Sequence, residues 1–304
     1  MNDSLPLRVL RYRQSRDGDV VGYGLGVDIG TASISVAVRQ DGQTRMVPPA
    51  DPPITPRIPQ GSGPTFVVQA LADALDAVLK AVTEQFGEGP DTVVLTYQAH
   101  EGQYGQELME EAANLAGLGR VRVVSDLEAA ATHYVTRENL PPGALFAVCD
   151  LGAGPYSVAL AGVSELGATE IGPVESVNDV GGKAFNDLVL AEVDRQLDGE
   201  VSGLDLNESV GLRAQERLGI EGERAKIALS DKDSATINVL LPYSPAKSKT
   251  RVRQSEAVLS RDAFEAMIVT PLSGALEATH RVLGAAQVLP EHLSGVMLIG
   301  GSSR

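Results

Sequence analysis

Residues 25–38, LGVDIGTASISVAV, and residues 145–163, LFAVCDLGAGPYSVALAGV, are two versions of one pattern. In each, a buried run leads through an aspartate into a turn of small residues, and alternating residues then predict a second strand. When Asp28 is placed on Asp150, the two stretches align without a gap. The identical pairs are Asp28 and Asp150, Gly30 and Gly152, Ser35 and Ser157, Val36 and Val158, and Ala37 and Ala159. The repetition indicates an internal duplication.

Each turn places a carboxylate at a strand end and small residues behind it. These residues are Gly30, Thr31 and Ala32 in the first turn and Gly152, Ala153 and Gly154 in the second. Backbone N–H groups approach phosphate oxygens closely only where few Cβ atoms intervene. Asp28 and Asp150 would hold Mg²⁺ through water, because magnesium keeps several waters and takes few protein carboxylates. One such turn is also typical of an ordinary hairpin, but two at equivalent places favour a phosphate site.

The rest of the chain predicts alternating helices and strands, and therefore an α/β fold. Helices are expected over residues 67–82, 104–115, 180–197 and 204–229, and after Ser260, where Pro271 should kink the last one. Strands are expected over residues 92–96, 121–125, 234–242 and 295–301. The proline-rich stretch 48–64 predicts a loop.

Length and composition restrict the class of protein. At 304 residues the chain exceeds the usual single core, which favours two lobes. A net charge of −15 argues against a nucleic-acid partner, and the two short basic stretches, 8–16 and 247–253, are interpreted as solvated strand edges or loops. Cys149 is the only cysteine, which fits a reducing compartment. With no apolar stretch long enough to cross a bilayer, we expect a cytoplasmic location.

Five segments, in order, carry a resemblance to a known family: GVDIGTASISVAV, DLGAGPYSVAL, NDVGGKAFN, EGERAKIALSD and LIGGSSR. Together they resemble the nucleotide-binding domain of DnaK-type seventy-kilodalton heat-shock chaperones, members of the actin-like ATPase superfamily. The resemblance runs from about Leu25 to the last residue, and its most specific part is Glu223-x-x-Lys226-x-x-x-Ser230. It implies a duplicated actin-like ATPase (ribonuclease H-like) fold, with two lobes around a cleft that binds ATP or ADP with Mg²⁺.

The resemblance also implies a role for each matching residue. Gly30, Thr31 and Ala32 correspond to the first phosphate loop, Gly152, Ala153 and Gly154 to the second, and Gly181 and Gly182 to the glycine pair near the terminal phosphates. Glu223, Lys226 and Ser230 correspond to the helix face on adenine and ribose, and Gly300, Gly301, Ser302 and Arg304 to the adenosine turn. Glu223, Lys226 and Ser230 are three and four residues apart, which places them on one face of a helix. The alternative for Glu223 and Lys226 is a surface ion pair.

Several departures from the family concern the reaction. The family's catalytic lysine lies in a small subdomain between the first hairpin and the helix that follows it. In this chain that interval is the short proline-rich loop, no lysine precedes Lys80, and the cations of the interval are Arg45 and Arg57. Pro155 stands where the family has threonine. The family's coupling proline and glutamate align with Gln98 and Asp126, and we include Asp126 with Asp28 and Asp150 as candidate catalytic residues. Because phosphoryl transfer depends on positioned charge, we expect slow or absent hydrolysis.

These expectations define a domain plan and a function. We expect an N-terminal extension over 1–22, lobe I over 23–143 with a reduced subdomain, and lobe II over 144–304 with a small subdomain at about 187–259. The chain ends just after the adenosine motif, so a protein partner or a missing C-terminal domain is expected. The favoured function is an ATP/ADP-binding domain whose lobe closure is controlled by nucleotide, with weak ATPase activity if active. The alternatives are a non-catalytic pseudo-ATPase scaffold and, less favoured, a small-molecule kinase of the same superfamily.

Overall fold

A computed structural model describes residues 22–48, 54, 56, 58–59, 61–165, 167–243 and 251–303. The described residues form two compact units. The first takes its residues from Met1–Asp150, Ser157–Ser176 and Thr279–Ile299, and the second from Leu151–Tyr156, Val177–Ala278 and Gly300–Arg304. These units group the chain differently from the two expected lobes, whose boundaries stay a prediction. The N-terminal extension lies outside the described residues apart from Gly22, as does much of the proline-rich stretch.

The first unit contains a five-stranded mixed sheet with the order β3-β2-β1-β4-β5. Its strands are β1 (Gly24–Ile29), β2 (Ile34–Gln40), β3 (Gln43–Val47), β4 (Thr92–Tyr97) and β5 (Val121–Ser125). β1, β2 and β3 form an antiparallel meander, whereas β1, β4 and β5 run parallel. The carboxyl ends of the three parallel strands therefore lie at one edge of the sheet, the usual place for ligand-binding groups.

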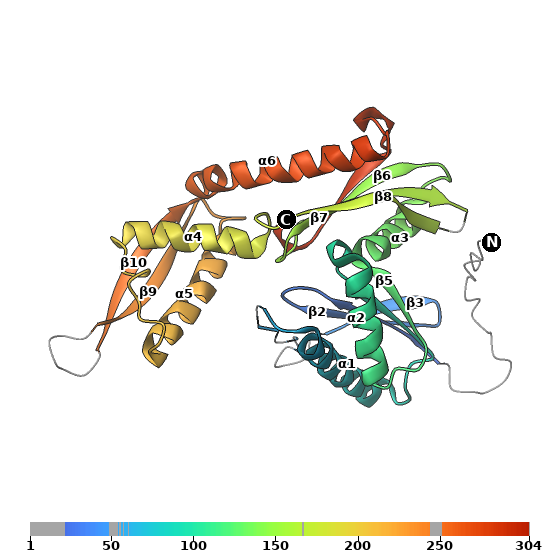
Figure 1. Cartoon of the computed structure of the whole chain (residues 1–304), viewed down its shortest axis with the longest axis horizontal. Helices are drawn as coiled ribbons and strands as arrows, with labels where there is room; N and C mark the ends of the chain where they lie inside the picture. The colour runs from blue at the N-terminus through green and yellow to red at the C-terminus, as the bar shows by residue number, and fades with distance from the viewer. Residues whose placement is uncertain are drawn as a thin grey trace. The chain divides into compact units, whose positions relative to one another are not determined.

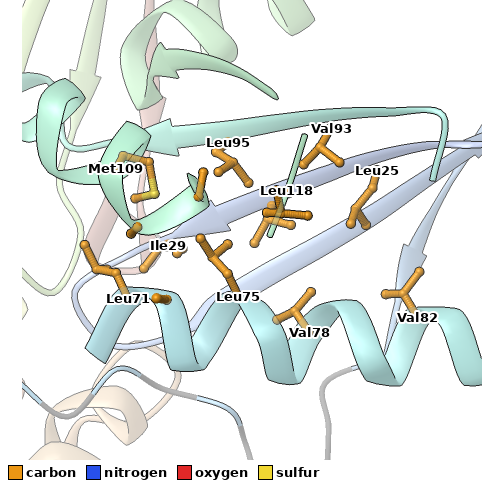
Figure 2. Packing of buried hydrophobic residues seen from close by; sticks show 14 of the residues in the cluster. Leu25, Ile29, Leu71, Leu75, Val78, Val82, Val93, Leu95, Met109 and Leu118 are labelled. Atoms are coloured by element: carbon orange, nitrogen blue, oxygen red, sulfur yellow. The ribbon is translucent and has the colours of Figure 1, made fainter. Parts of the chain in front are cut away.

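Helices α1 (Pro64–Phe86) and α2 (Gly102–Leu115) pack against this sheet. Leu71, Leu75, Val78 and Val82 of α1 recur at helical spacing, so they form one apolar face. Figure 2 shows this face pointing toward Leu25, Ile29, Val93 and Leu95 of the sheet, with Met109 of α2 in the same cluster. The helix begins at a proline, which is preorganised for a first turn, and Gly87 ends it by donating its N–H to the carbonyl of Thr83 at 2.8 Å.

A second sheet in the same unit has the order β11-β6-β7-β8. It consists of β6 (Leu145–Asp150), β7 (Tyr156–Ser164), β8 (Gly167–Val177) and β11 (Gly295–Ile299), with β6 antiparallel to β7 and parallel to β11. Asp150 pairs with Ser157 just as Asp28 pairs with Ser35 on β1 and β2. The shared register supports the duplication predicted from the sequence, and the two sheets with their helices confirm the actin-like α/β fold class.

Helix α3 (Asp126–Glu138) begins directly after β5 and packs on the second sheet. Ser125 caps it, because its hydroxyl accepts the backbone N–H of Glu128 at 2.9 Å. The buried core beneath it includes Leu127, Phe146 and Val148. The cap therefore fixes where Asp126, the first residue of the helix, meets the edge of the sheets.

The second unit is built from α4 (Gly182–Gln196), α5 (Ser209–Ala228) and the antiparallel hairpin of β9 (Ser234–Tyr243) and β10 (Arg251–Ser260) (Figure 1). Its core joins Val189 of α4, Leu218 of α5 and Ile237 of β9. Helix α6 (Arg261–Ala285) follows, as expected after Ser260, whose hydroxyl accepts the N–H of Ala263 at 3.2 Å. The helix continues through Pro271, and the expected kink stays a prediction.

Short 3-10 helices complete the described structure at Ala99–Glu101, Pro290–His292 and Gly301–Ser303. Across the described residues, none of the helices combines the length and the apolar character that a bilayer span requires.

Candidate functional site

Three aspartates of the first unit lie at the ends of its strands. Asp28 is next to last in β1, and its Oδ1 accepts the hydroxyl of Thr96, at the end of β4, at 2.6 Å. Asp126 opens α3 directly after β5, and its Oδ1 accepts the backbone N–H of Ala99 at 2.9 Å and of Leu127 at 2.8 Å. Asp150 is the last residue of β6. Each carboxylate is thus fixed by the strand architecture.

The pKa values of Asp126 and Asp150 are raised by burial and by neighbouring carboxylates. Burial raises the pKa of Asp126 to about 7, and the charges of Asp150 and Asp28 raise it further against the lowering effect of its backbone hydrogen bonds. Burial also raises the pKa of Asp150 to about 6, with Asp28 adding to the effect. Among the described residues, no ion pair includes any of the three. Within the described residues these carboxylates are therefore not neutralised by a paired side chain.

A hydrated Mg²⁺ fits this donor set. A nearby cation stabilises the ionised form of carboxylates whose pKa is raised, as it is for Asp126 and Asp150, and hard oxygen donors are the ligands that Mg²⁺ prefers. Within the part of the chain that the structure describes, no three side chains of His, Cys, Asp or Glu are grouped for direct coordination. Contact of Asp28 and Asp150 with the metal through water stays a prediction.

The first turn is open to solvent. Gly30 donates its N–H to the carbonyl of Ser33 at 3.0 Å, which closes the turn, and Thr31 and Ala32 are exposed on it. The hydroxyl of Thr31 accepts a hydrogen bond from the side-chain amide of Gln98 at 2.9 Å. The turn therefore presents a small exposed surface that is tied to the end of β4 by one side chain.

The second turn lies in the second unit and is packed against the start of α4. The carbonyl of Gly152 accepts the N–H of Gly182 at 2.8 Å, and that of Ala153 accepts the N–H of Lys183 at 2.9 Å. Gly181 has φ +151, and a Cβ there would lie 1.8 Å from the carbonyl oxygen of Gly154. Only glycine fits at this position. The N–H groups of Gly182 and Lys183 are used inside the protein in this conformation, so a role for Gly181 and Gly182 at terminal phosphates stays a prediction.

Lys226 of helix α5 contacts the start of α4, beside the second turn. Its Nζ donates to the carbonyl of Gly182 at 2.9 Å, and burial lowers the pKa of this half-buried lysine, against the effect of the Glu223 charge. Glu223 is exposed one turn earlier, and Ser230 is exposed just beyond the end of the helix. Within the described residues Glu223 and Lys226 form no ion pair with each other. The lysine instead holds the backbone beside the second turn.

The adenosine turn joins the same network. Gly300 has φ +89, and it leads into the 3-10 helix Gly301–Ser303. Ser302 donates its N–H to the carbonyl of Leu151 at 2.9 Å and its hydroxyl to that of Gly152 at 3.0 Å. The second turn, the glycine pair, Lys226 and Ser302 thus form one hydrogen-bonded group. Arg304 lies outside the described residues.

The structure brings the sequence-predicted residues together in two sets. Asp28, Asp126, Asp150 and the first turn belong to the first unit, whereas the second turn, the glycine pair, Lys226 and Ser302 belong to the second. Sequence reasoning missed Thr96, although a polar residue ending a parallel strand beside β1 is a signal that could have identified it. The exposed side chain of Arg45 contacts Gln43, and Arg57 lies outside the described residues.

Comparisons with known proteins agree with this geometry. The profile of the Hsp70 protein family matches residues 61–304. The chain is 31% identical over 251 residues to the chaperone protein HscA of Escherichia coli O17:K52:H18, 30% to that of Escherichia fergusonii and 29% to that of Shigella boydii serotype 18. Each alignment covers 82% of this chain and 37% of the relative, so the chain spans well under half the length of these chaperones.

The family profile covers most of the chain, including the second turn, the glycine pair, the α5 motif and the adenosine turn. The first turn precedes the matched range, but it repeats the second in sequence and in strand register. The cytoplasmic location expected from the sequence stays a prediction. The chain belongs to the Hsp70 protein family, as a divergent nucleotide-binding domain.

Proposed function

We propose that this domain binds ATP and ADP together with Mg²⁺. The observation that carries the proposal is the group of three aspartates at the strand ends, of which Asp126 and Asp150 have raised pKa values because they are buried near other carboxylates. A magnesium nucleotide supplies a cation to this group and phosphates to the small-residue turn beside Asp28. The family assignment supports the same ligand.

The proposed contacts follow from the resemblance of these residues to the family's motifs. Asp28 and Asp150 hold the waters of Mg²⁺, and the backbone of Gly30, Thr31 and Ala32 faces phosphate oxygens. Gly152, Ala153 and Gly154 form the second phosphate turn, with Gly181 and Gly182 behind it. Glu223, Lys226 and Ser230 face the adenosine with Gly300, Gly301, Ser302 and Arg304. The metal, when bound, offsets charge on the phosphates.

Asp126 is our candidate for receiving a proton from an attacking water. A pKa of about 7 suits a general base that works near neutral pH. Two backbone N–H groups orient the carboxylate, which supports a defined direction for the transfer. Hydrolysis is nevertheless slow or absent in our proposal, because Pro155 offers no hydroxyl and no lysine precedes Lys80 to offset charge on the moving phosphoryl group.

The wider role that we propose is signalling by lobe closure. Nucleotide binding would change the closure of the two lobes, and a partner or a C-terminal domain would respond to that change. The similar proteins are named chaperones, and the chain corresponds to 37% of their length. A chaperone function for the protein that contains this domain is therefore part of the proposal.

Isothermal titration of the folded chain with ATP and ADP, with and without Mg²⁺, tests the proposal. We expect both nucleotides to bind, and ATP to bind more tightly when Mg²⁺ is present. Asp28→Asn should remove most of the magnesium effect, whereas Asp187→Asn, a change of an exposed carboxylate on α4, should preserve it. A folded chain that binds neither nucleotide would overturn the proposal and favour the non-catalytic scaffold.

A phosphate-release assay separates the remaining alternatives. We expect release that is slow or below detection at saturating ATP. Retained binding without turnover describes a pseudo-ATPase. ATP consumption that depends on an added sugar or acid would instead identify a small-molecule kinase.

A further inference from the structure

Three of the four residues of the segment Thr96–Ala99, at the end of β4 and just beyond it, form hydrogen bonds to Asp28, Thr31 and Asp126. The hydroxyl of Thr96 donates to Asp28, the amide of Gln98 donates to Thr31, and the backbone N–H of Ala99 donates to Asp126. All of these residues belong to the first unit. The segment Thr96–Ala99 therefore sets the positions of two aspartates and of the first turn at once.

The hydrogen bond from Gln98 determines which role the hydroxyl of Thr31 plays. An amide NH₂ group only donates, so the oxygen of Thr31 is the acceptor in the 2.9 Å hydrogen bond. The proton of the threonine hydroxyl is then left for another acceptor. Because Thr31 is exposed on the open turn, its hydroxyl is accessible to a ligand. A hydroxyl that already accepts one hydrogen bond also becomes a better donor.

We propose that Gln98 is a positioning residue that orients the Thr31 hydroxyl as a hydrogen-bond donor to a phosphate oxygen of the nucleotide. The inference rests on the proposed nucleotide binding and adds a specific interaction to it. Thr96 fixes the aspartate of the first turn and Gln98 fixes its threonine, so the two side chains hold the turn at two points. A bond from a hydroxyl to an ionised phosphate is charge-assisted, so its orientation affects affinity.

Gln98 occupies the position at which the sequence aligns with a proline of the resembled family. A proline has no side-chain amide and cannot make this contact. The contact to Thr31 is therefore a feature of this chain's own sequence. Through this contact, a side chain just beyond the end of β4 holds the first turn.

A double-mutant cycle tests the proposal in the full chain. We expect Gln98→Met, which keeps the length but removes the amide, and Thr31→Ala each to weaken ATP binding about 3- to 10-fold. The double variant should be no weaker than Thr31→Ala alone, because Gln98 acts through the threonine hydroxyl. Thr31→Ser keeps the hydroxyl and should retain the full effect of Gln98→Met.

Adenosine is the second ligand, because it lacks phosphates. Its affinity should be the same in wild type and in Gln98→Met, which separates positioning of the turn from a general structural effect. Gln103→Ala is the matched control, since this exposed glutamine on α2 donates its side-chain hydrogen bond to Glu107 on the same helix. It should leave both affinities unchanged.

The outcomes separate this inference from the proposed function. Additive losses in the double variant, or an equal loss of adenosine and ATP affinity in Gln98→Met, would overturn the positioning role while nucleotide binding stands. A folded wild-type chain that binds neither ATP nor adenosine overturns both. Urea unfolding of each variant establishes that the chain is folded in every titration.

Discussion

The two turns that begin as copies in the sequence have different surroundings in the structure. The first turn is exposed to solvent. One backbone hydrogen bond, from Gly30 to Ser33, forms the turn, and the side chain of Gln98 holds it. The second turn is packed, with its carbonyls on the N–H groups that begin α4 and its small residues against Gly181. Duplication preserved the strand register at Asp28 and Asp150, but it did not preserve how the turns are held.

Because they are held differently, the two turns should respond differently to substitutions. A turn that is fixed by side chains tolerates changes of shape and depends on polar groups. A turn that is fixed by close backbone contact depends on the absence of Cβ atoms. Substitutions that add volume should therefore separate the two turns, and substitutions that remove a polar group should show what each contact contributes.

The largest effect is expected for Gly181→Ala. The new Cβ would lie 1.8 Å from the carbonyl oxygen of Gly154, at a φ of +151 that alanine rarely adopts. We expect a loss of about 3 kcal/mol or more in the free energy of unfolding, with loss of nucleotide binding. Urea unfolding followed by circular dichroism measures the change.

Gly219→Ala is the control for that substitution. Gly219 lies inside α5 with nothing within 4 Å of the position of a Cβ, so alanine should stabilise the protein by about 0.5–1 kcal/mol. If Gly181→Ala is as stable as the control, the second turn is not packed as described and the contrast between the turns is lost.

Asp126→Asn should change how stability depends on pH. The folded-state pKa of about 7 lies above the unfolded value of about 3.8, so the stabilisation associated with protonated Asp126 is complete below about pH 4 and is lost as the pH rises through 7. Asparagine stays neutral and can accept the same two N–H groups. We expect the variant to be about 1–3 kcal/mol more stable than wild type at pH 8.

The measurement is urea unfolding at several pH values between 4 and 8. The advantage of Asp126→Asn should grow with pH, and Asp187→Asn should show no such growth. A constant difference at every pH would mean that the charge of Asp126 is not what the variant removes. This outcome would mean that the surroundings of Asp28, Asp126 and Asp150 do not depend on charge in the way that distinguishes them from the second turn.

Lys226→Met tests the polar contact of the packed turn. Removing the hydrogen bond to the carbonyl of Gly182 should reduce the free energy of unfolding by about 1 kcal/mol and weaken nucleotide binding several-fold. Lys80→Met is the matched control, because Lys80 is exposed on α1 and pairs only with Asp76 in the described residues. Titration and urea unfolding of both variants should give an effect for Lys226 alone; equal effects would remove the role of Lys226.

Gly30→Ala should have the smallest effect and completes the comparison with Gly181→Ala. A Cβ at Gly30 would lie 3.2 Å from the carbonyl oxygen of Ser33, a tight contact that a small shift of the open turn relieves. We expect a change within about 1 kcal/mol in urea unfolding. A loss as large as that of Gly181→Ala would show that the first turn is as constrained as the second.

The sequence was sufficient for features that depend on local pattern. The period of the apolar residues predicts α1 from Leu71, Leu75 and Val78, and the repeated aspartate turns predict the duplication that the strand register supports. The family motifs predict the fold class. These signals are contained within short stretches, so no long-range contact is needed to see them.

Other features were missed because of how local signals were weighed. Helix α3 was not predicted, although Ser125 and Glu128 have the spacing of a capping box. Strand β10 was not predicted over its length, although the basic run with Arg251 and Arg253 was interpreted as a solvated strand edge or loop and these exposed residues do lie on a strand of a two-stranded sheet. Its charged side chains conceal the alternation that marks a strand, which becomes buried only at Ala257 and Leu259.

The effect of the neighbouring carboxylates on Asp126 could not be predicted from sequence at all. The parallel pairing of β1 with β4 and of β4 with β5 brings the ends of the strands that carry Asp28 and precede Asp126 to one edge of the sheet from distant parts of the chain. The same is true of the contact from Thr96 to Asp28 and of that from Gln98 to Thr31. Candidate residues can be identified one at a time, but their charges and partners follow from the sheet.

Cys149 gives this arrangement a built-in reporter. It is the only thiol in the sequence, it is buried, and it immediately precedes Asp150 on β6. A thiol reagent can reach it only when that strand is exposed by local or global opening, so the rate of alkylation measures how often the strand opens in the native state. Slower alkylation with ATP and Mg²⁺ present would record the ligand's stabilisation of this strand without any label or substitution.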